Sequence, residues 1–197
     1  YPLSLARTPG ADFVLATPSE LDSILAFVQG IGRTNDLVLT AVSLADAGAE
    51  LGRNLFIDPA KRCNGCHNNA GGHNSAGFSK NFNTGVETVR IAALDALLIP
   101  RDGGFGQALS FDHDSDGDGT LDSFGNGTFN APPLVEAADT GPFFHTNAFL
   151  TIEDAVVFYT SPAFANSPSG NGNPIQLSQI EVANVGRFLR VINAAMN

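Results

Sequence analysis

The stretch Cys63-Asn64-Gly65-Cys66-His67 decides how the rest of this 197-residue sequence is interpreted. Two cysteines three positions apart, with a histidine directly after the second, form the pattern by which a c-type haem is attached to a protein. Each thiol adds across one haem vinyl group, and the imidazole binds the iron from the proximal side. Asn64 and Gly65 suit the turn, because both tolerate positive φ. The pattern predicts one covalent haem held by Cys63, Cys66 and His67.

Three other interpretations of the cysteines stay open at this point. A structural disulfide would leave His67 without a role. Zinc is a second option, but there is no further cysteine, so the metal would need two of the four histidines, His67, His73, His113 and His145. A thioredoxin-like redox pair is typical of a βαβ context, which the sequence does not indicate.

The composition indicates a globular, acidic and exported protein. With 43% hydrophobic residues the chain can build one sizeable core, and 21 Gly with 11 Pro predict long loops. The net charge of −10 argues against nucleic acid and anionic membranes as partners, and suits calcium or a basic protein. No apolar run approaches the roughly 18 residues of a membrane span. Because haem c is attached outside the bacterial cytoplasm, we expect a periplasmic or extracellular protein whose leader has been removed.

Apolar periodicity and capping residues predict a mainly α fold. Helices are expected over residues 17–31, 42–55, 87–99 and 177–195, and from a cap at Thr151. Residues 1–45 are interpreted as an N-terminal extension with one amphipathic helix. Residues 46–197 are interpreted as a cytochrome c-type haem domain with long loops rich in Gly, Pro and Asn.

The first and last of these helices resemble each other. Residues 20–31 align with residues 181–192, with Glu, Phe and Ile identical at matching positions. One interpretation is that any two amphipathic helices resemble each other in this way. In the other, the first helix is the remnant of a preceding cytochrome unit.

The segment from Asp112 to Asp122 has the pattern of a calcium-binding loop. Counted from Asp114, carboxylates occupy positions one, three, five and nine, with Gly119 at position six. Gly125 replaces the usual bidentate Glu at position twelve, so other oxygens are needed, much as in thrombospondin type 3 repeats, which the segment resembles. A solvated acidic loop is the alternative. The predicted ligands are Asp112, Asp114, Asp116, Asp118, Thr120 and Asp122.

Four segments in this order resemble the bacterial di-haem cytochrome c peroxidase family, which includes the enzyme that matures the tryptophan-derived cofactor of methylamine dehydrogenase. They are residues 51–56, 63–67, 82–85 and 132–159, the last with Gly-Pro-Phe-Phe-His. The resemblance implies a mostly helical cytochrome c-type domain. In the family, two such domains hold two haems, one receiving electrons and one meeting peroxide, with calcium between them.

The chain departs from that family at two points. It carries one haem motif, so we expect a redox protein partner, either another haem-bearing chain or a further haem domain. Phe129 stands where relatives often place Met or Tyr, and a phenyl ring cannot bind iron. His145 is the first candidate for a distal-side group and His73 the second, with Glu136 as an alternative acid–base residue. Met196 is expected to pack in the fold.

Three functions follow from these patterns. The first is an electron-transfer cytochrome with one low-spin haem. The second is a peroxidase-like or oxygen-reactive haem enzyme with an open distal face, where an acid–base group moves a proton between two oxygens. The third is a calcium-stabilised subunit whose haem is structural.

Overall fold

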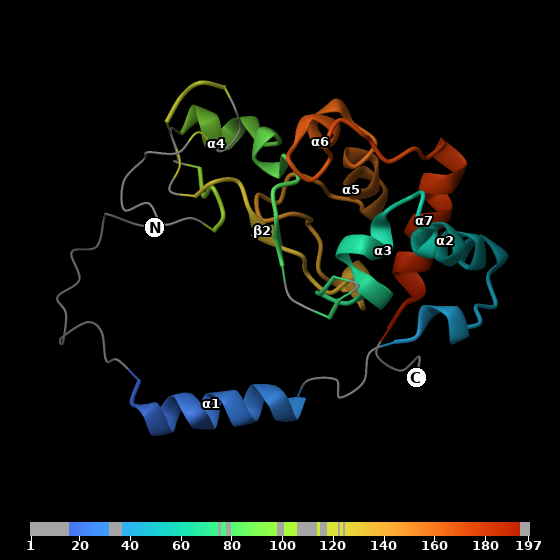
Figure 1. The fold of residues 1–197 in the computed structure, drawn as a ribbon, viewed down its shortest axis with the longest axis horizontal. Helices are drawn as coiled ribbons and strands as arrows, with labels where there is room; N and C mark the ends of the chain where they lie inside the picture. Colours follow the sequence, from blue (N-terminus) through green and yellow to red (C-terminus); the bar gives the residue numbers. More distant parts are fainter. Residues whose placement is uncertain are drawn as a thin grey trace. The chain divides into compact units, whose positions relative to one another are not determined.

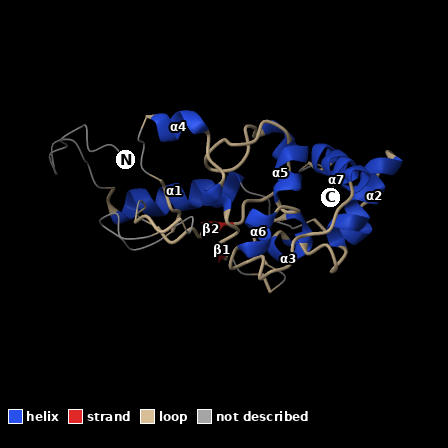
Figure 2. Ribbon diagram, turned by 90° about the horizontal axis from the view of Figure 1, so that it is seen from above, coloured by secondary structure: helices blue, strands red, loops and turns tan. Residues whose placement is uncertain are grey.

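The computed structural model describes residues 16–31, 37–74, 76–77, 80–97, 101–105, 114, 118–121, 123 and 125–193. These residues are mainly helical, as predicted, with one small sheet of two strands (Figures 1 and 2). The chain divides into two compact units, residues 1–35 and residues 36–197. Within the described ranges, no helix has both the length and the apolar character needed to cross a membrane.

The first unit contributes helix α1, Pro18–Ile31. Thr17 Oγ1 accepts a hydrogen bond from Glu20 N at 3.3 Å, and Glu20 Oε2 accepts one from Thr17 N at 2.7 Å. This reciprocal arrangement is a capping box, and Ser178 and Glu181 form the same arrangement at the start of α7, Gln179–Val191. The likeness between the two segments therefore extends to how each helix begins, while a common origin stays a prediction.

The second unit is built on helix α2, Ala47–Ile57, which packs against α7 (Figure 1). The predicted start at Val42 is wrong, because Val42 is extended and the cap comes at Asp46, which accepts a hydrogen bond from Ala49 N at 2.7 Å. The residues just before Val42 form a 3-10 turn, η1, Leu39–Ala41. At its other end, α2 continues past the predicted last residue to Ile57.

Gly52 allows α2 and α7 to approach each other closely. A Cβ atom at this position would lie 1.9 Å from Asn184 O and 2.9 Å from Phe188 Cβ. Beside it, the rings of Phe56 and Phe188 lie 5.4 Å apart. Buried apolar residues from both helices, from the segment before α2 and from two shorter helices form the main core: Leu37, Leu39, Phe56, Ala70, Ile152, Val185, Phe188, Leu189 and Ile192.

The remaining elements are short. They are α3 (Cys63–Cys66), η2 (Asn68–Ala70), β1 (Asn81–Phe82), η3 (Val86–Thr88), α4 (Ala92–Ala96), β2 (Phe129–Asn130), η4 (Ala137–Asp139), α5 (Ile152–Phe158) and α6 (Pro162–Asn166). Strands β1 and β2 are antiparallel, with Phe82 opposite Phe129. Thr151 caps α5 as predicted, accepting from Asp154 N at 3.1 Å.

Two predicted helices have different bounds in the structure. The helix expected over 87–99 is divided, because Val89 is extended and separates η3 from α4. The closing helix expected over 177–195 runs over Gln179–Val191, since its capping box fixes the start and Ile192 is extended at the end.

Candidate cofactor pocket

Both cysteines stand on one helical turn, α3, which with His67 is here called the attachment turn. Neither Asn64 nor Gly65 has positive φ in the structure. The left-handed residue is Arg62, directly before the turn, with φ 64°. Because residues three apart in a helix lie on the same face, the two thiols are presented together.

The attachment turn lines a pocket of about 620 Å³. Cofactor and ligand sites typically measure roughly 300–1,000 Å³. Cys63, Cys66 and His67 all contribute to its lining, and aromatic and aliphatic side chains from α2, β1, β2, α5, α6 and α7 form its walls. The sequence-predicted haem residues are therefore together, at an apolar cavity large enough for a cofactor.

A backbone carbonyl fixes the His67 imidazole. Nδ1 lies 2.9 Å from the carbonyl oxygen of Pro132. A carbonyl can only accept, so Nδ1 carries the proton and the Nε2 lone pair is left for a ligand-binding role. Burial lowers the pKa of His67, which favours the neutral ring that binds metals. An outer hydrogen bond of this kind is how proteins orient a metal-binding histidine.

The cysteines lack the features of the alternative sites. They are not bonded to each other. Burial raises the pKa of Cys63 to about 11 and also raises that of Cys66, whereas redox-active and nucleophilic cysteines have lowered values. Across the part of the chain that the structure describes, no three His, Cys, Asp or Glu side chains are grouped to hold a metal ion. Both thiols are therefore neutral groups at an apolar wall.

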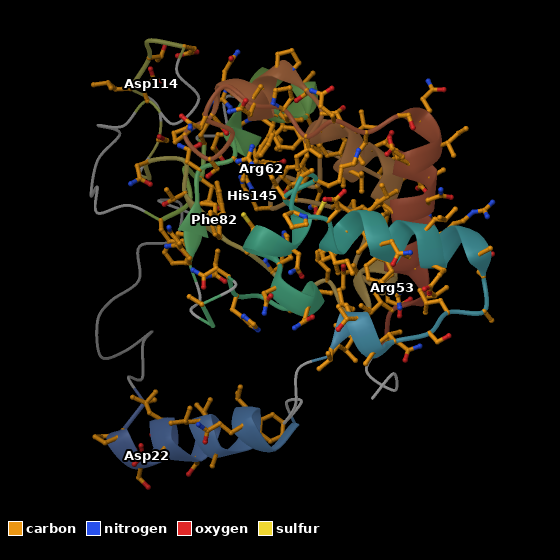
Figure 3. The ribbon with its side chains drawn as sticks, turned by 45° about the vertical axis from the view of Figure 1, so that its right-hand side comes forward. Asp22, Arg53, Arg62, Phe82, Asp114 and His145 are labelled. Carbon is orange, nitrogen blue, oxygen red and sulfur yellow. The ribbon has the colours of Figure 1, made fainter. Side chains whose placement is uncertain are left out.

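His145 lines the same pocket as the attachment turn. Its Nε2 is paired with the carboxylate of Glu87, and its ring stacks on Phe129 with centroids 3.9 Å apart. Figure 3 shows His145 in the same region as Arg62, which precedes Cys63, and Phe82 of β1. The first predicted distal candidate is thus at the cavity, with Phe129 as a flat wall beside it.

Glu87 is a pocket-side residue that the sequence analysis did not identify. Its side chain is 2% exposed. Burial raises its pKa, but the hydrogen bond with His145, a contact from Gly103 N and the charge of Arg101 outweigh that effect, so the pKa lies below its usual value. Nothing in the turn that precedes Glu87 indicates this role, because its partner lies far along the chain.

Arg62 connects the attachment turn to the segment after α6. Its guanidinium donates hydrogen bonds to the carbonyl oxygens of Ser169 at 2.7 Å, Asn173 at 2.8 Å and Gly170 at 3.3 Å. It also lies over the ring of Phe164, 5.7 Å from the centroid. No local pattern predicts these hydrogen bonds, which position the backbone next to Cys63.

The other histidine and acidic candidates are not pocket residues. His73 does not line the cavity, and its Nδ1 lies 3.0 Å from Asn74 O. Glu136 is exposed and also does not line it. His113 and Met196 lie outside the described residues.

The Asp-rich segment is described in part. Asp114 accepts hydrogen bonds from Asp118 N at 3.1 Å and Gly119 N at 2.9 Å, and Thr120 N donates to Asp118 Oδ1 at 2.7 Å. Gly119 has φ +90°, which fits the sharp reversal expected at position six. Figure 3 shows Asp114 apart from Arg62 and His145. Three more predicted ligands lie outside the described residues: Asp112, Asp116 and Asp122.

The pocket therefore combines two neutral thiols on one turn, an imidazole with a free Nε2, and an apolar cavity. Such a set can hold a planar, largely apolar cofactor at one edge and bind a metal at its centre. His145, which lines the cavity, and its partner Glu87 form a histidine–carboxylate pair that can hold and move a proton. No protein-family model, curated protein or solved structure matches the chain.

Proposed function

We propose that this chain is an exported c-type cytochrome that binds one haem and transfers electrons. Cys63 and Cys66 would carry the thioether bonds, and His67 would be the proximal iron ligand. The observation that supports the proposal is the convergence of both thiols and the His67 imidazole on one apolar pocket. The domain would be of the type found in the di-haem cytochrome c peroxidase family.

The residues present fit this cofactor. Both cysteines are free and not joined in a disulfide, as addition across the vinyl groups requires, and one helical turn presents them three residues apart. The Pro132 carbonyl keeps His67 in the tautomer that leaves Nε2 free. When bound, haem supplies one-electron redox chemistry, while the apolar walls exclude water and so influence the potential.

Location, calcium and partners follow as parts of the same proposal. Haem attachment of this type implies a periplasmic or extracellular protein. Calcium would be held in the Asp-rich segment around Asp114 and Asp118, where the chain folds back so that the Asp114 carboxylate accepts hydrogen bonds from Asp118 N and Gly119 N. One haem motif in the chain implies exchange of electrons with a redox protein, such as a second haem-bearing chain or domain.

A second candidate function is a peroxidase-like or oxygen-reactive haem enzyme. His145, which lines the pocket and is paired with Glu87, favours it, because cleavage of peroxide requires a group that moves a proton between the two oxygens. Phe129, beside that pair, offers no ligand atom to iron.

Haem analysis of the exported protein tests the main proposal. The pyridine haemochrome spectrum should give one haem c per chain, and the denatured protein should contain no titratable thiol. Cys63→Ser and Cys66→Ser should each lose one thioether bond, and His67→Gln should lose the proximal ligand. His73→Gln, a histidine away from the pocket, is the matched control and should keep the wild-type spectrum. A colourless protein, or zinc between the thiols, would contradict the proposal.

The optical spectrum of the ferric protein separates the two functions. A six-coordinate, low-spin iron that resists cyanide is expected of an electron carrier. Rapid cyanide binding with peroxide turnover would instead support the enzyme.

A further inference from the structure

Among the described residues, the pair formed by the buried Glu87 and the pocket-lining His145 is not used by the electron-transfer proposal. Glu87 is 2% exposed and the His145 side chain is 19% exposed. Placing a carboxylate in so dry a position costs free energy unless its partners satisfy it. Here the partners are His145 Nε2, Gly103 N at 3.4 Å from Oε2, and the nearby charge of Arg101.

Two contacts fix the orientation of the His145 ring. The Glu87 carboxylate occupies Nε2, and Phe129 covers one face of the ring at a centroid distance of 3.9 Å and an interplanar angle of 21°. A carboxylate accepts hydrogen bonds, so Nε2 carries a proton and cannot at the same time bind iron. Nδ1 is then the ring nitrogen that remains to accept a proton.

We propose that Glu87 is a positioning residue, which holds His145 as the proton acceptor of the pocket and keeps its Nε2 from the iron. The inference rests on the second candidate function, a haem whose distal face is open to small ligands. The relevant ligands are small weak acids, H–X, such as hydrogen cyanide and hydrogen peroxide, which lose a proton when they bind ferric iron. His145 Nδ1 would take up the proton that such an acid releases, the conjugate base would be left free to bind the iron, and the Glu87 carboxylate would lie against the imidazolium so formed.

Cyanide association with the ferric holoprotein, followed by stopped flow, tests the inference without requiring an enzyme activity. Glu87→Gln keeps the size of the side chain but removes its charge, and should slow association about 10–100-fold, the usual effect of removing an orienting partner. His145→Gln keeps a donor for Glu87 but removes the proton acceptor, and should slow association at least as much. Glu153→Gln is the matched control, because Glu153 is paired with Arg190 and does not line the pocket.

A double-mutant cycle separates positioning from a general structural effect. If Glu87 acts through His145, the double variant Glu87→Gln/His145→Gln should be no slower than His145→Gln alone. Glu87→Asp keeps the charge but withdraws it by one methylene, and should give a smaller defect than Glu87→Gln. This second variant keeps the test valid if Glu87→Gln does not fold or retain haem.

Three results would overturn the inference. They are a Glu87→Gln rate within about twofold of the Glu153→Gln control, an equal slowing by Glu87→Gln in the His145→Gln background, or a wild-type haem that does not bind cyanide. Each of these leaves the cytochrome proposal standing, because the haemochrome spectrum measures haem content independently. Absence of haem from the wild-type protein would instead overturn the proposed function itself.

Discussion

Replacing Gly52 with alanine should destabilise the second unit more than any other single methyl addition between α2 and α7. The new Cβ would lie 1.9 Å from Asn184 O, a backbone atom that cannot rotate away, and 2.9 Å from Phe188 Cβ. Overpacking usually costs about 1–3 kcal/mol, and a backbone clash this short should cost roughly 4 kcal/mol. Alanine recovers about 1 kcal/mol of helix propensity, so we expect a net loss of about 3 kcal/mol.

The consequences of Gly52→Ala reach the pocket, because both helices contribute to its walls. Phe56 comes from α2, and Val185 and Leu189 come from α7. For a domain of this size the loss should lower Tm by roughly 6–12 °C. Circular dichroism follows the helices during thermal unfolding, and the haem absorption band reports in the same experiment whether the pocket opens first.

The matched control is Gly48→Ala, one turn earlier on the same helix. Its Cβ would meet Arg187 Nη1 at 2.6 Å and Arg187 Cδ at 2.8 Å, atoms of a flexible and 60% exposed side chain that can move aside. The substitution should therefore change stability by less than about 1 kcal/mol. If the two variants unfold at the same temperature, the close approach of α2 and α7 is not what Gly52 provides.

Three further predictions concern the helix cap, a thiol and calcium. Ser178→Ala should cost about 0.5–2 kcal/mol by removing the cap of α7. The hydrogen bond from Ser178 N, with Lys61, lowers the pKa of Glu181 to about 2 from 4.5, so this stabilisation is present above pH 4.5 and lost as pH falls towards 2. The Tm difference between wild type and Glu181→Gln, which removes the titrating charge, should accordingly shrink in acid, and a difference independent of pH would contradict the assignment. In the haem-free chain, burial raises the pKa of Cys63 from 9.0 to about 11, so alkylation at pH 8 should be about 100-fold slower than for an ordinary thiol. This contribution to stability is present below pH 9 and lost as pH rises through 11; peptide mapping that finds Cys63 fully modified at pH 8 would refute it. EDTA should lower Tm in wild type but not in Asp114→Asn, with a loss near 2.7 kcal/mol if free calcium is about 100 times its Kd. An unchanged wild-type Tm would remove calcium from the proposal.

Local signals in the sequence predicted the local features of the fold. The mainly helical class, the cap at Thr151 and the reversal at Gly119 each depend on neighbouring residues, and each is present. The start of α2 was placed too early because Val42 and Leu44 continue the apolar pattern. Apolar spacing does not distinguish a helix from an extended lead-in, whereas the side chain of Asp46 does.

Contacts between distant segments could not be predicted in the same way. The attachment pattern identified Cys63, Cys66 and His67, but their common cavity depends on residues from many other elements along the chain. Glu87 follows an ordinary turn, and only the folded chain brings it to His145. From the sequence, Gly52 is only a residue of low helix propensity. Its role is evident once the structure places the backbone of α7 against it.

The acceptor for His67 Nδ1 is a main-chain oxygen, and this has an evolutionary consequence. A substitution at position 132 does not remove that carbonyl oxygen, so the hydrogen bond to the His67 ring is kept when the side chain changes. The carbonyl oxygen moves away from His67 only if the backbone changes its path, for instance after an insertion or deletion between Pro132 and Leu134. Homologous chains should therefore vary freely in the residue type here while conserving the spacing.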